Sequence, residues 1–307
     1  MKKYYFLVLF AFLFSGISIA QEEENDQDST EEAEEEKSNW NMGGNFAILI
    51  NQASFNRDWL GGGVSNYSAN LVVSYDINYA KDRLSWDTKF LGDYGITQTK
   101  DQDFSRKTND RLELNSVIGY KVKEDSKWSY SGMMNFRTQF APGYIFGTDG
   151  EGNETRTLQT DFMSPAFLQF GLGALWKQSD NFRINISPAT GRVIMANSRF
   201  TSFEGYQDGD FFGLDAGKSA RYEFGAALTG YGKFTLMKNV TMENFVNLYA
   251  NYLENFGNVD IDYTLNLVMK VNKYISTNFT MQAIYDDNAV RGFQIRQVLG
   301  VGVSFTL

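Results

Sequence analysis

Charged side chains recur at alternate positions in segments whose intervening positions are apolar. Arg221 and Glu223 show this spacing, as do Asp260 and Asp262. Residues two apart lie on the same face of a β-strand, so each pair predicts a strand with one charged face. Facing carboxylates and guanidinium groups can form ion pairs, hold a polar solute or, where unpaired, supply a base. By this parity we expect one common interior to be lined by Arg111, Glu113, Arg137, Arg183, Arg221, Glu223, Glu243, Asp260, Asp262 and Arg296, with Lys121 and Lys233 beside them.

The composition narrows the chemistry of this set. The 307 residues include no Cys and no His, which excludes disulfides, thiolate metal sites and Ser-His-Asp hydrolysis. A base would have to be a carboxylate such as Glu243 or Asp262, and inward carboxylates beside arginines are more simply ion-paired. We therefore expect no catalytic residue, metal or cofactor. The sequence also lacks the basic face that a nucleic-acid partner would require, so we expect no nucleic-acid partner.

The N-terminal residues predict export. Lys2 and Lys3 precede an apolar run from 4 to 14, and Ser18-Ile19-Ala20 forms a small-x-small cleavage site, so 1–20 reads as a signal peptide. Residues 21–38 then carry ten carboxylates against one lysine and predict a disordered periplasmic leader. Without residues 1–38, the chain has 27 acidic and 25 basic side chains, so the low isoelectric point belongs to the leader.

Residues 39–307 form one predicted domain of β-strands, because their apolar residues recur with period two. In 293–307 the odd-numbered residues are mostly large and apolar, while the even-numbered ones include Gln294, Arg296, Gly300 and Ser304. The segments 67–79, 112–122 and 260–271 repeat this pattern. In 46–50, by contrast, the apolar run is continuous and the alternation is poor.

The connections between these strands alternate in length. Tight polar turns are expected at 80–83, 124–126, 178–180, 238–239 and 272–273. Longer segments are expected at 54–64, 98–110, 141–164, 190–219, 254–258 and 287–292. Six hairpins give about twelve strands with short periplasmic turns and longer extracellular loops, the topology of a transmembrane antiparallel up-and-down β-barrel.

Aromatic and proline residues agree with this topology. Aromatic rings flank the short turns, as expected for an interfacial girdle; they are Tyr79, Trp86, Tyr120, Trp128, Trp176 and Phe182. Pro142 and Pro165 fall in the longer segments or at strand ends, whereas Pro188 is expected to truncate or kink the seventh strand.

Two further motifs are weak. Residues 213–219 resemble a phosphate-binding loop, but three residues rather than four separate the glycines, and a flexible loop is the better interpretation. Residues 149–154 and 286–288 offer oxygen ligands of the kind calcium prefers, yet a polar turn explains them equally well.

Several short strings resemble an uncharacterised family of Gram-negative outer-membrane β-barrels, a domain-of-unknown-function family. They are Asn56–Gly63 with its W-x-G-G, Arg106–Arg111, the F-x-T-Q-F-x-P-G-Y of Phe136–Tyr144, the Y-D-D of Tyr285–Asp287, and Leu299–Val303. The resemblance covers the whole mature chain and implies the fold and the outer membrane as location. It implies no chemistry. The count of six hairpins separately predicts that both ends of the barrel are periplasmic.

The charged interior leaves two functions open. It can be the lining of a passive channel for small polar solutes, or an ion-pair network that closes the lumen of a structural barrel within an envelope complex. The segments 141–164 and 190–219 are long enough to plug the lumen. A membrane-embedded enzyme without His is the least favoured alternative. The expected partners are outer-membrane lipid, lipopolysaccharide and, for the second function, other envelope proteins.

Overall fold

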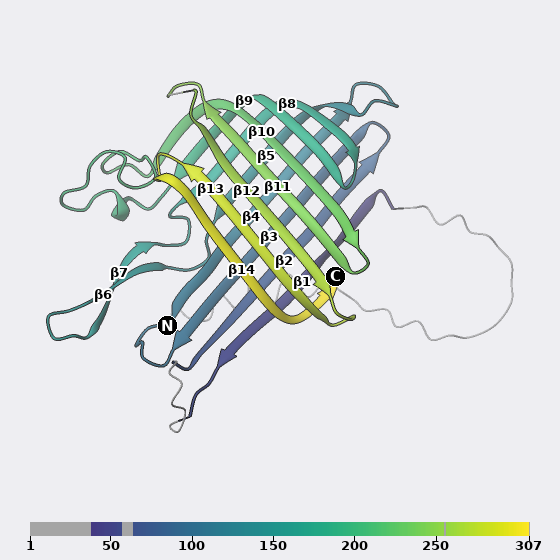
Figure 1. The fold of residues 1–307 in the computed structure, drawn as a ribbon. Coiled ribbons are helices and arrows are strands. Elements are labelled where there is room, and N and C mark those ends of the chain that lie inside the picture. Colours follow the sequence, from purple (N-terminus) through teal and green to yellow (C-terminus); the bar gives the residue numbers. More distant parts are fainter. Residues whose placement is uncertain (1–37, 57–63, 255, 307) are drawn as a thin grey trace. The chain divides into compact units, whose positions relative to one another are not determined.

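In the computed structural model, which describes residues 38–56, 64–254 and 256–306, twelve antiparallel strands close into a ring (Figure 1). The signal peptide and nearly all of the acidic leader lie outside these residues. Each strand pairs with its neighbours along the chain, and β1 pairs with β14. The ring consists of β1 (Trp40–Ala53), β2 (Asn66–Lys81), β3 (Leu84–Thr99), β4 (Arg106–Lys121), β5 (Trp128–Thr138), β8 (Ala166–Ser179), β9 (Phe182–Met195), β10 (Ala220–Met237), β11 (Val240–Asn251), β12 (Val259–Lys270), β13 (Ile275–Asp286) and β14 (Val290–Thr306).

Short and long connections alternate around the ring as the sequence predicts. Two-residue turns join β2 to β3 and β10 to β11, and in them Asp82 and Asn239 adopt φ of 52° and 67°. Asp and Asn tolerate this left-handed conformation, which tight hairpins require. We call this the short-turn end of the ring and the opposite one the long-loop end.

The two faces of the wall have opposite polarity. On β14, Leu299 and Val301 are exposed on the outer face, whereas Ser304 is buried inside. On β3, Lys89 is 0% exposed although it is charged. Exposed apolar and buried charged side chains reverse the pattern of a water-soluble protein. Aromatic rings gather outside the short-turn end, where the Trp40 ring lies 4.9 Å from Tyr79 and 6.1 Å from Trp86 between centroids.

Strand β9 corrects the prediction that a long connection begins at residue 190. The strand continues to Met195, because Pro188 is accommodated in a bulge. On the β8 side the pairing skips from Ile186 to Ala189, and on the β10 side from Ser187 to Thr190, so Pro188 pairs with neither neighbour. Its missing N–H therefore breaks no ladder bond. The expected connection 98–110 is likewise shorter, because β3 runs to Thr99 and β4 begins at Arg106.

The ring closes where the two ends of the barrel sequence meet. Residues 45–49 of β1 pair with residues 302–306 of β14, the shortest pairing in the ring among the residues that the structure describes. Here Leu49 points inward and is buried, close to where a side chain at Gly300 would lie. At Gly302 a Cβ atom would lie 1.9 Å from the Ile48 carbonyl oxygen. Glycine on one strand thus accommodates an apolar residue on the other, which explains the continuous apolar run of 46–50.

Two long segments form structure of their own at the long-loop end. Residues 141–164 contain a separate hairpin of β6 (Gly143–Thr148) and β7 (Glu154–Thr160). After β9, a short 3-10 helix (Ser198–Phe200) begins a loop whose Leu214 is fully buried against Ile194 and Ala196. Phe212 of this loop stacks edge-on with Phe167, 5.9 Å between ring centroids.

Within the described residues, no helix is both long and apolar enough to span a membrane.

Candidate functional site

Polar contacts cross the interior of the barrel between strands far apart in the ring. Lys89 of β3 lies 3.3 Å from the carboxylate of Glu243 on β11, six strands away around the ring in either direction. Arg137 of β5 forms an ion pair with Asp262 of β12. Because these side chains meet across the lumen, the strands β3 to β5 are tied directly to β11 and β12.

Arg111 on β4 is the centre of one such group, which we call the Arg111 cluster. Its guanidinium donates to the Asp93 carboxylate at 2.8 Å and to the Thr264 hydroxyl at 3.2 Å. Glu113 lies 3.6 Å away, and Arg296 approaches Asp93 from β14 at 2.6 Å. Asp93 thus bridges two arginines, and the cluster links β3, β4, β12 and β14.

A second group, the Arg192 cluster, lies nearer the long-loop end. Arg192 is 5% exposed and reaches Glu223 at 2.6 Å and Asp260 at 2.5 Å. Arg221 also approaches Glu223, at 3.0 Å. The Arg192 guanidinium further lies 4.2 Å from the centroid of the Tyr249 ring. Two arginines therefore neutralise a carboxylate that is almost fully removed from solvent.

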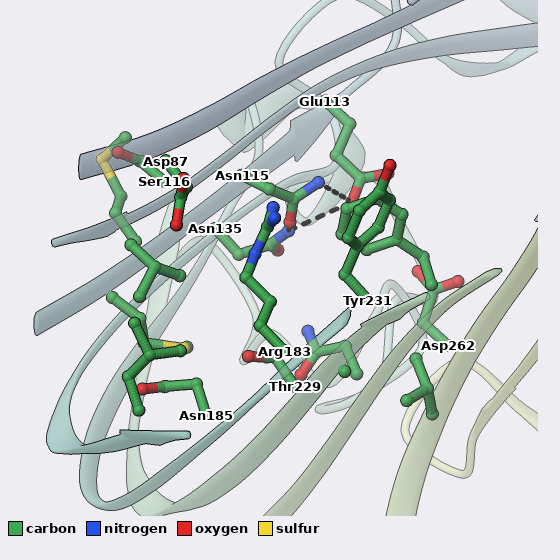
Figure 2. Close-up of a pocket in the computed structure, with 18 of the residues that line it drawn as sticks. Asp87, Glu113, Asn115, Ser116, Asn135, Arg183, Asn185, Thr229, Tyr231 and Asp262 are labelled. Carbon is green, nitrogen blue, oxygen red and sulfur yellow. Dashed lines mark hydrogen bonds between the residues drawn. The ribbon is translucent and has the colours of Figure 1, made fainter. Parts of the chain in front are cut away.

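Amide side chains fill the space around Glu113. The Glu113 carboxylate accepts hydrogen bonds from Asn115 at 2.9 Å and Asn135 at 3.1 Å, as Figure 2 shows. Arg183 and Tyr231 line the same small cavity, and the Arg183 guanidinium lies 4.5 Å from the centroid of the Tyr231 ring. The cavity has a volume of about 40 Å³, room for only a few water molecules.

The predicted set is thus distributed among several groups. Arg111, Glu113 and Arg296 share one cluster, Arg221, Glu223 and Asp260 another, and Arg137 pairs with Asp262. Glu243 lies between Lys89 and Lys233, and Arg183 contacts an aromatic ring. Lys121 donates to the Glu124 carbonyl in the turn after β4, at 3.3 Å.

Several interior residues were missed by the sequence analysis. They include Asp87, Lys89, Asp93, Lys177 and Arg192. The first three alternate along β3, so the period-two rule applied to that strand would have found them. Arg192 was missed because it falls in the segment 190–219, which was expected to be a long connection after Pro188.

Two larger cavities lie at opposite ends of the lumen and share Arg111 in their linings. One, of about 410 Å³, includes Asn41 and Asp180 near the short-turn end. The other, of about 290 Å³, includes Asp286 and Phe212 at the long-loop end. The Arg111 cluster therefore stands between two vestibules.

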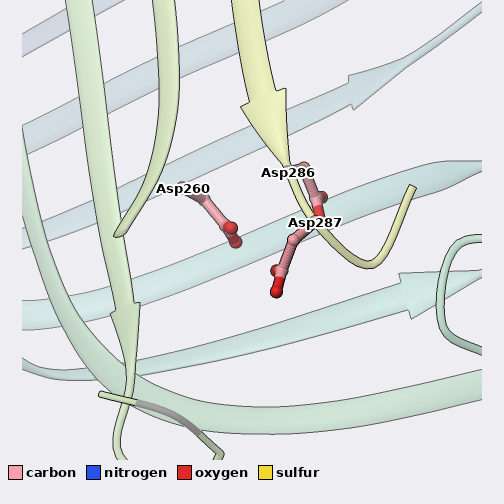
Figure 3. A group of neighbouring side chains, drawn as sticks. All are labelled: Asp260, Asp286 and Asp287. Atoms are coloured by element: carbon pink, nitrogen blue, oxygen red, sulfur yellow. The ribbon is translucent and has the colours of Figure 1, made fainter. Parts of the chain in front are cut away.

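Three carboxylates gather at the long-loop end of the lumen. Asp260 on β12 faces Asp286 and Asp287 at the end of β13 (Figure 3), with carboxylate oxygens within 4.8 Å of one another. Asp260 is ion-paired with Arg192, and Asp286 accepts the Asn288 backbone N–H at 3.0 Å. The group places three carboxylates beside Arg192 at this mouth of the lumen.

Outside the ring, Glu154 fastens the hairpin β6–β7 to the connection between β3 and β4. It pairs with Arg106 and accepts the backbone N–H groups of Asp103 at 2.9 Å and Phe104 at 3.1 Å. Partial desolvation raises the pKa of Glu154, but these donors outweigh it and hold the pKa below its ordinary value.

Acidification is expected to loosen this attachment. Because the pKa of Glu154 is depressed in the folded protein, its stabilising effect is complete above the ordinary glutamate pKa and is lost as pH falls through the depressed value. Hydrogen exchange, corrected for intrinsic rates, should show the Asp103 and Phe104 amides losing protection over that range. Glu154→Gln should lower their protection at neutral pH, and Glu151→Gln, in the exposed turn, should not. Equal protection in Glu154→Gln and the unaltered chain would contradict this role.

Comparison with known proteins gives one family match. Residues 50–144 match the model of a family described as "Protein of unknown function (DUF3078)", a shorter stretch than the expected resemblance over the whole mature chain. No curated protein matches the chain.

Among solved structures, the translocator domain of the autotransporter NalP from Neisseria meningitidis is 8% identical, with 89% of this chain and 90% of that chain covered and a TM-score of 0.38. The NanC porin is 12% identical, with 87% and 100% covered and a TM-score of 0.35. Such values carry no functional argument. The closed ring of twelve strands, apolar outside and charged inside, is by its own architecture the fold of an outer-membrane β-barrel.

Proposed function

We propose that this protein lies in the outer membrane and passes small polar solutes through a narrow charged lumen whose constriction is the Arg111 cluster. The short-turn end faces the periplasm in this proposal, and the long loops face outward. The observation that carries it is the pair of vestibules, about 410 and 290 Å³, that share Arg111. A purely structural barrel needs no cavity at either end.

The cross-lumen ion pairs favour a second candidate, a non-conducting structural barrel within an envelope complex. Lys89–Glu243 and Arg137–Asp262 tie opposite walls together, and a fully engaged network resists solute entry. The two candidates differ in whether the side chains of the Arg111 cluster move aside to let a solute pass or stay in place and block the lumen.

No catalytic step is part of the proposal. The carboxylates that could replace histidine as a base are engaged, because Glu243 lies 3.3 Å from Lys89 and 3.0 Å from Lys233, and Asp262 pairs with Arg137. A carboxylate held between cations is a weak base. Turnover of lipid by the refolded protein would contradict this part of the proposal.

Arg111→Ala is expected to raise the single-channel conductance in planar bilayers severalfold, because it removes the side chain that separates the vestibules. The unaltered protein should show small discrete steps. Lys123→Ala, in an exposed short turn, serves as the control and should conduct like the unaltered protein. Folded protein that stays silent both unaltered and as Arg111→Ala would reject the channel and favour the structural barrel.

A further inference from the structure

A pocket at the long-loop rim of the barrel, beside the vestibule of about 290 Å³, has the chemistry of a binding site. It has a volume of about 480 Å³ and lies between the long-loop ends of β3 and β4 and the hairpin β6–β7. We call it the rim pocket. Its lining includes three aromatic rings, two basic groups and a carboxylate that is paired with one of them, namely Tyr94, Tyr144, Phe146, Lys107, Arg156 and Asp110.

Arg156 is the basic group of the rim pocket with hydrogen-bonding capacity left over. Its guanidinium carbon lies 4.5 Å from the ring centroids of both Phe104 and Tyr144. Cation–π contacts use the charge of a guanidinium but none of its N–H donors. Within the described residues, Arg156 forms no ion pair or side-chain hydrogen bond, so its planar set of donors remains available to an anion.

The other cations near the rim pocket are already engaged. Lys107 donates to Asp110 at 2.9 Å and to the Ala141 carbonyl at 2.8 Å. Arg106 is paired with Glu154 and lies over the ring of Phe146. The charge available to a ligand is therefore that of Arg156, which two aromatic rings hold in place.

The rim pocket also lies at a defined height on the wall. Tyr94 pairs with Asp110 across β3 and β4, and both follow the outward parity of these strands. Toward the short-turn end, the outward positions of β4 become apolar at Leu112 and Leu114. The change from apolar to polar and aromatic residues marks the boundary of the apolar belt. Headgroups of the outer leaflet would lie at this level.

We propose that the rim pocket binds an anionic sugar, one bearing phosphate or carboxylate, in the headgroup of an outer-leaflet glycolipid. Arg156 contacts the anion in a planar, charge-assisted arrangement. Tyr144 and Phe146 add aromatic surface to the lining against which a sugar ring can pack. The Gln139 amide is already hydrogen-bonded to the Asp161 and Ser164 carbonyls, so it helps to shape the pocket. This inference rests on the outer-membrane location proposed above but not on conduction.

Native mass spectrometry of the full barrel, reconstituted with lipopolysaccharide and then extracted in mild detergent, tests the site. Arg156→Ala should reduce lipopolysaccharide retention about tenfold or more, since a charge-assisted hydrogen bond contributes roughly 1.5–3 kcal/mol. Arg156→Lys keeps the charge but loses the planar set of N–H donors. Its lipopolysaccharide retention should therefore lie between that of Arg156→Ala and that of the unaltered protein. Arg199→Ala is the matched control, because Arg199 also lies at the long-loop end against a ring, that of Phe200, but is paired with Asp161.

Soluble trigalacturonate added to the same samples distinguishes the source of the sugar. Retention of lipopolysaccharide that depends on Arg156 and is not displaced by trigalacturonate supports the glycolipid site. Equal retention by Arg156→Ala and the unaltered protein overturns it. Arg156-dependent binding of trigalacturonate without retention of lipopolysaccharide overturns the assignment to a glycolipid. Flotation of the unaltered protein with vesicles is measured alongside, so that failure of the outer-membrane location is recognised separately.

Discussion

Replacing Arg192 with Met is expected to lower the free energy of unfolding of the barrel by about 3–5 kcal/mol, the cost of leaving a buried ion pair without one partner. Glu223 and Asp260 both depend on Arg192, at 2.6 and 2.5 Å. Glu223 has almost no access to solvent and would keep only Arg221. Urea unfolding in lipid vesicles, followed by tryptophan fluorescence, measures the change.

Two further variants control this prediction. Arg199→Met removes an arginine whose side chain is 48% exposed and paired with Asp161. Because exposed ion pairs contribute little, this change should lower the free energy of unfolding by at most about 1 kcal/mol. Adding Glu223→Gln and Asp260→Asn to Arg192→Met should recover much of the loss, because no uncompensated charge then remains. If Arg192→Met costs no more than Arg199→Met, the Arg192 cluster does not stabilise the fold in the way described.

Gly302→Ala is expected to prevent closure of the barrel. The added Cβ atom would lie 1.9 Å from the Ile48 carbonyl oxygen and 2.8 Å from the Leu49 Cα, and backbone atoms of a paired strand cannot move aside as the end of a flexible side chain can. The described part of this pairing is five residues long, so displacing β1 removes much of it. Folding into vesicles, read from the heat-modifiable shift on gels and from protease resistance, should fall to a small fraction of the unaltered yield.

Gly191→Ala is the matched control for this prediction. Gly191 also lies within a strand, β9, but no atom lies within 4 Å of the position its Cβ would take. Its folded yield should equal that of the unaltered chain. A normal yield for Gly302→Ala would show that the contact between β1 and β14 is looser than the structure indicates.

The strand pattern of this protein is readable from sequence because each strand has the same environment along its length. Lipid on one side and the lumen on the other impose a strict alternation, so the inward parity of Arg296 on β14 could be predicted. Leu49 departs from the rule because glycines on the neighbouring strand make room for an inward apolar side chain. Because β14 is distant from β1 in the sequence, the residues around Leu49 do not predict that glycines will lie beside it.

The pairing of charges across the lumen could not be predicted in the same way. Parity places Glu243 and Asp262 inside but does not say which cation each meets. Lys89 and Glu243 are brought together by how closely the opposite walls approach, which depends on packing of the whole ring. The same limit applies to the rim pocket, because Arg156 meets Phe104 only once the hairpin β6–β7 lies beside the β3–β4 connection.

The junction between β1 and β14 gives the cylinder a lengthwise line of least resistance. Among the described residues it has five residue pairs, whereas every other junction in the ring has ten or more. Within the described residues, it is also the one junction whose two strands, the first and the last of the ring, are not joined by a connecting segment. No loop therefore holds these two strands together after they separate. Local opening of the wall by thermal fluctuation is therefore expected at this junction before any other in the ring.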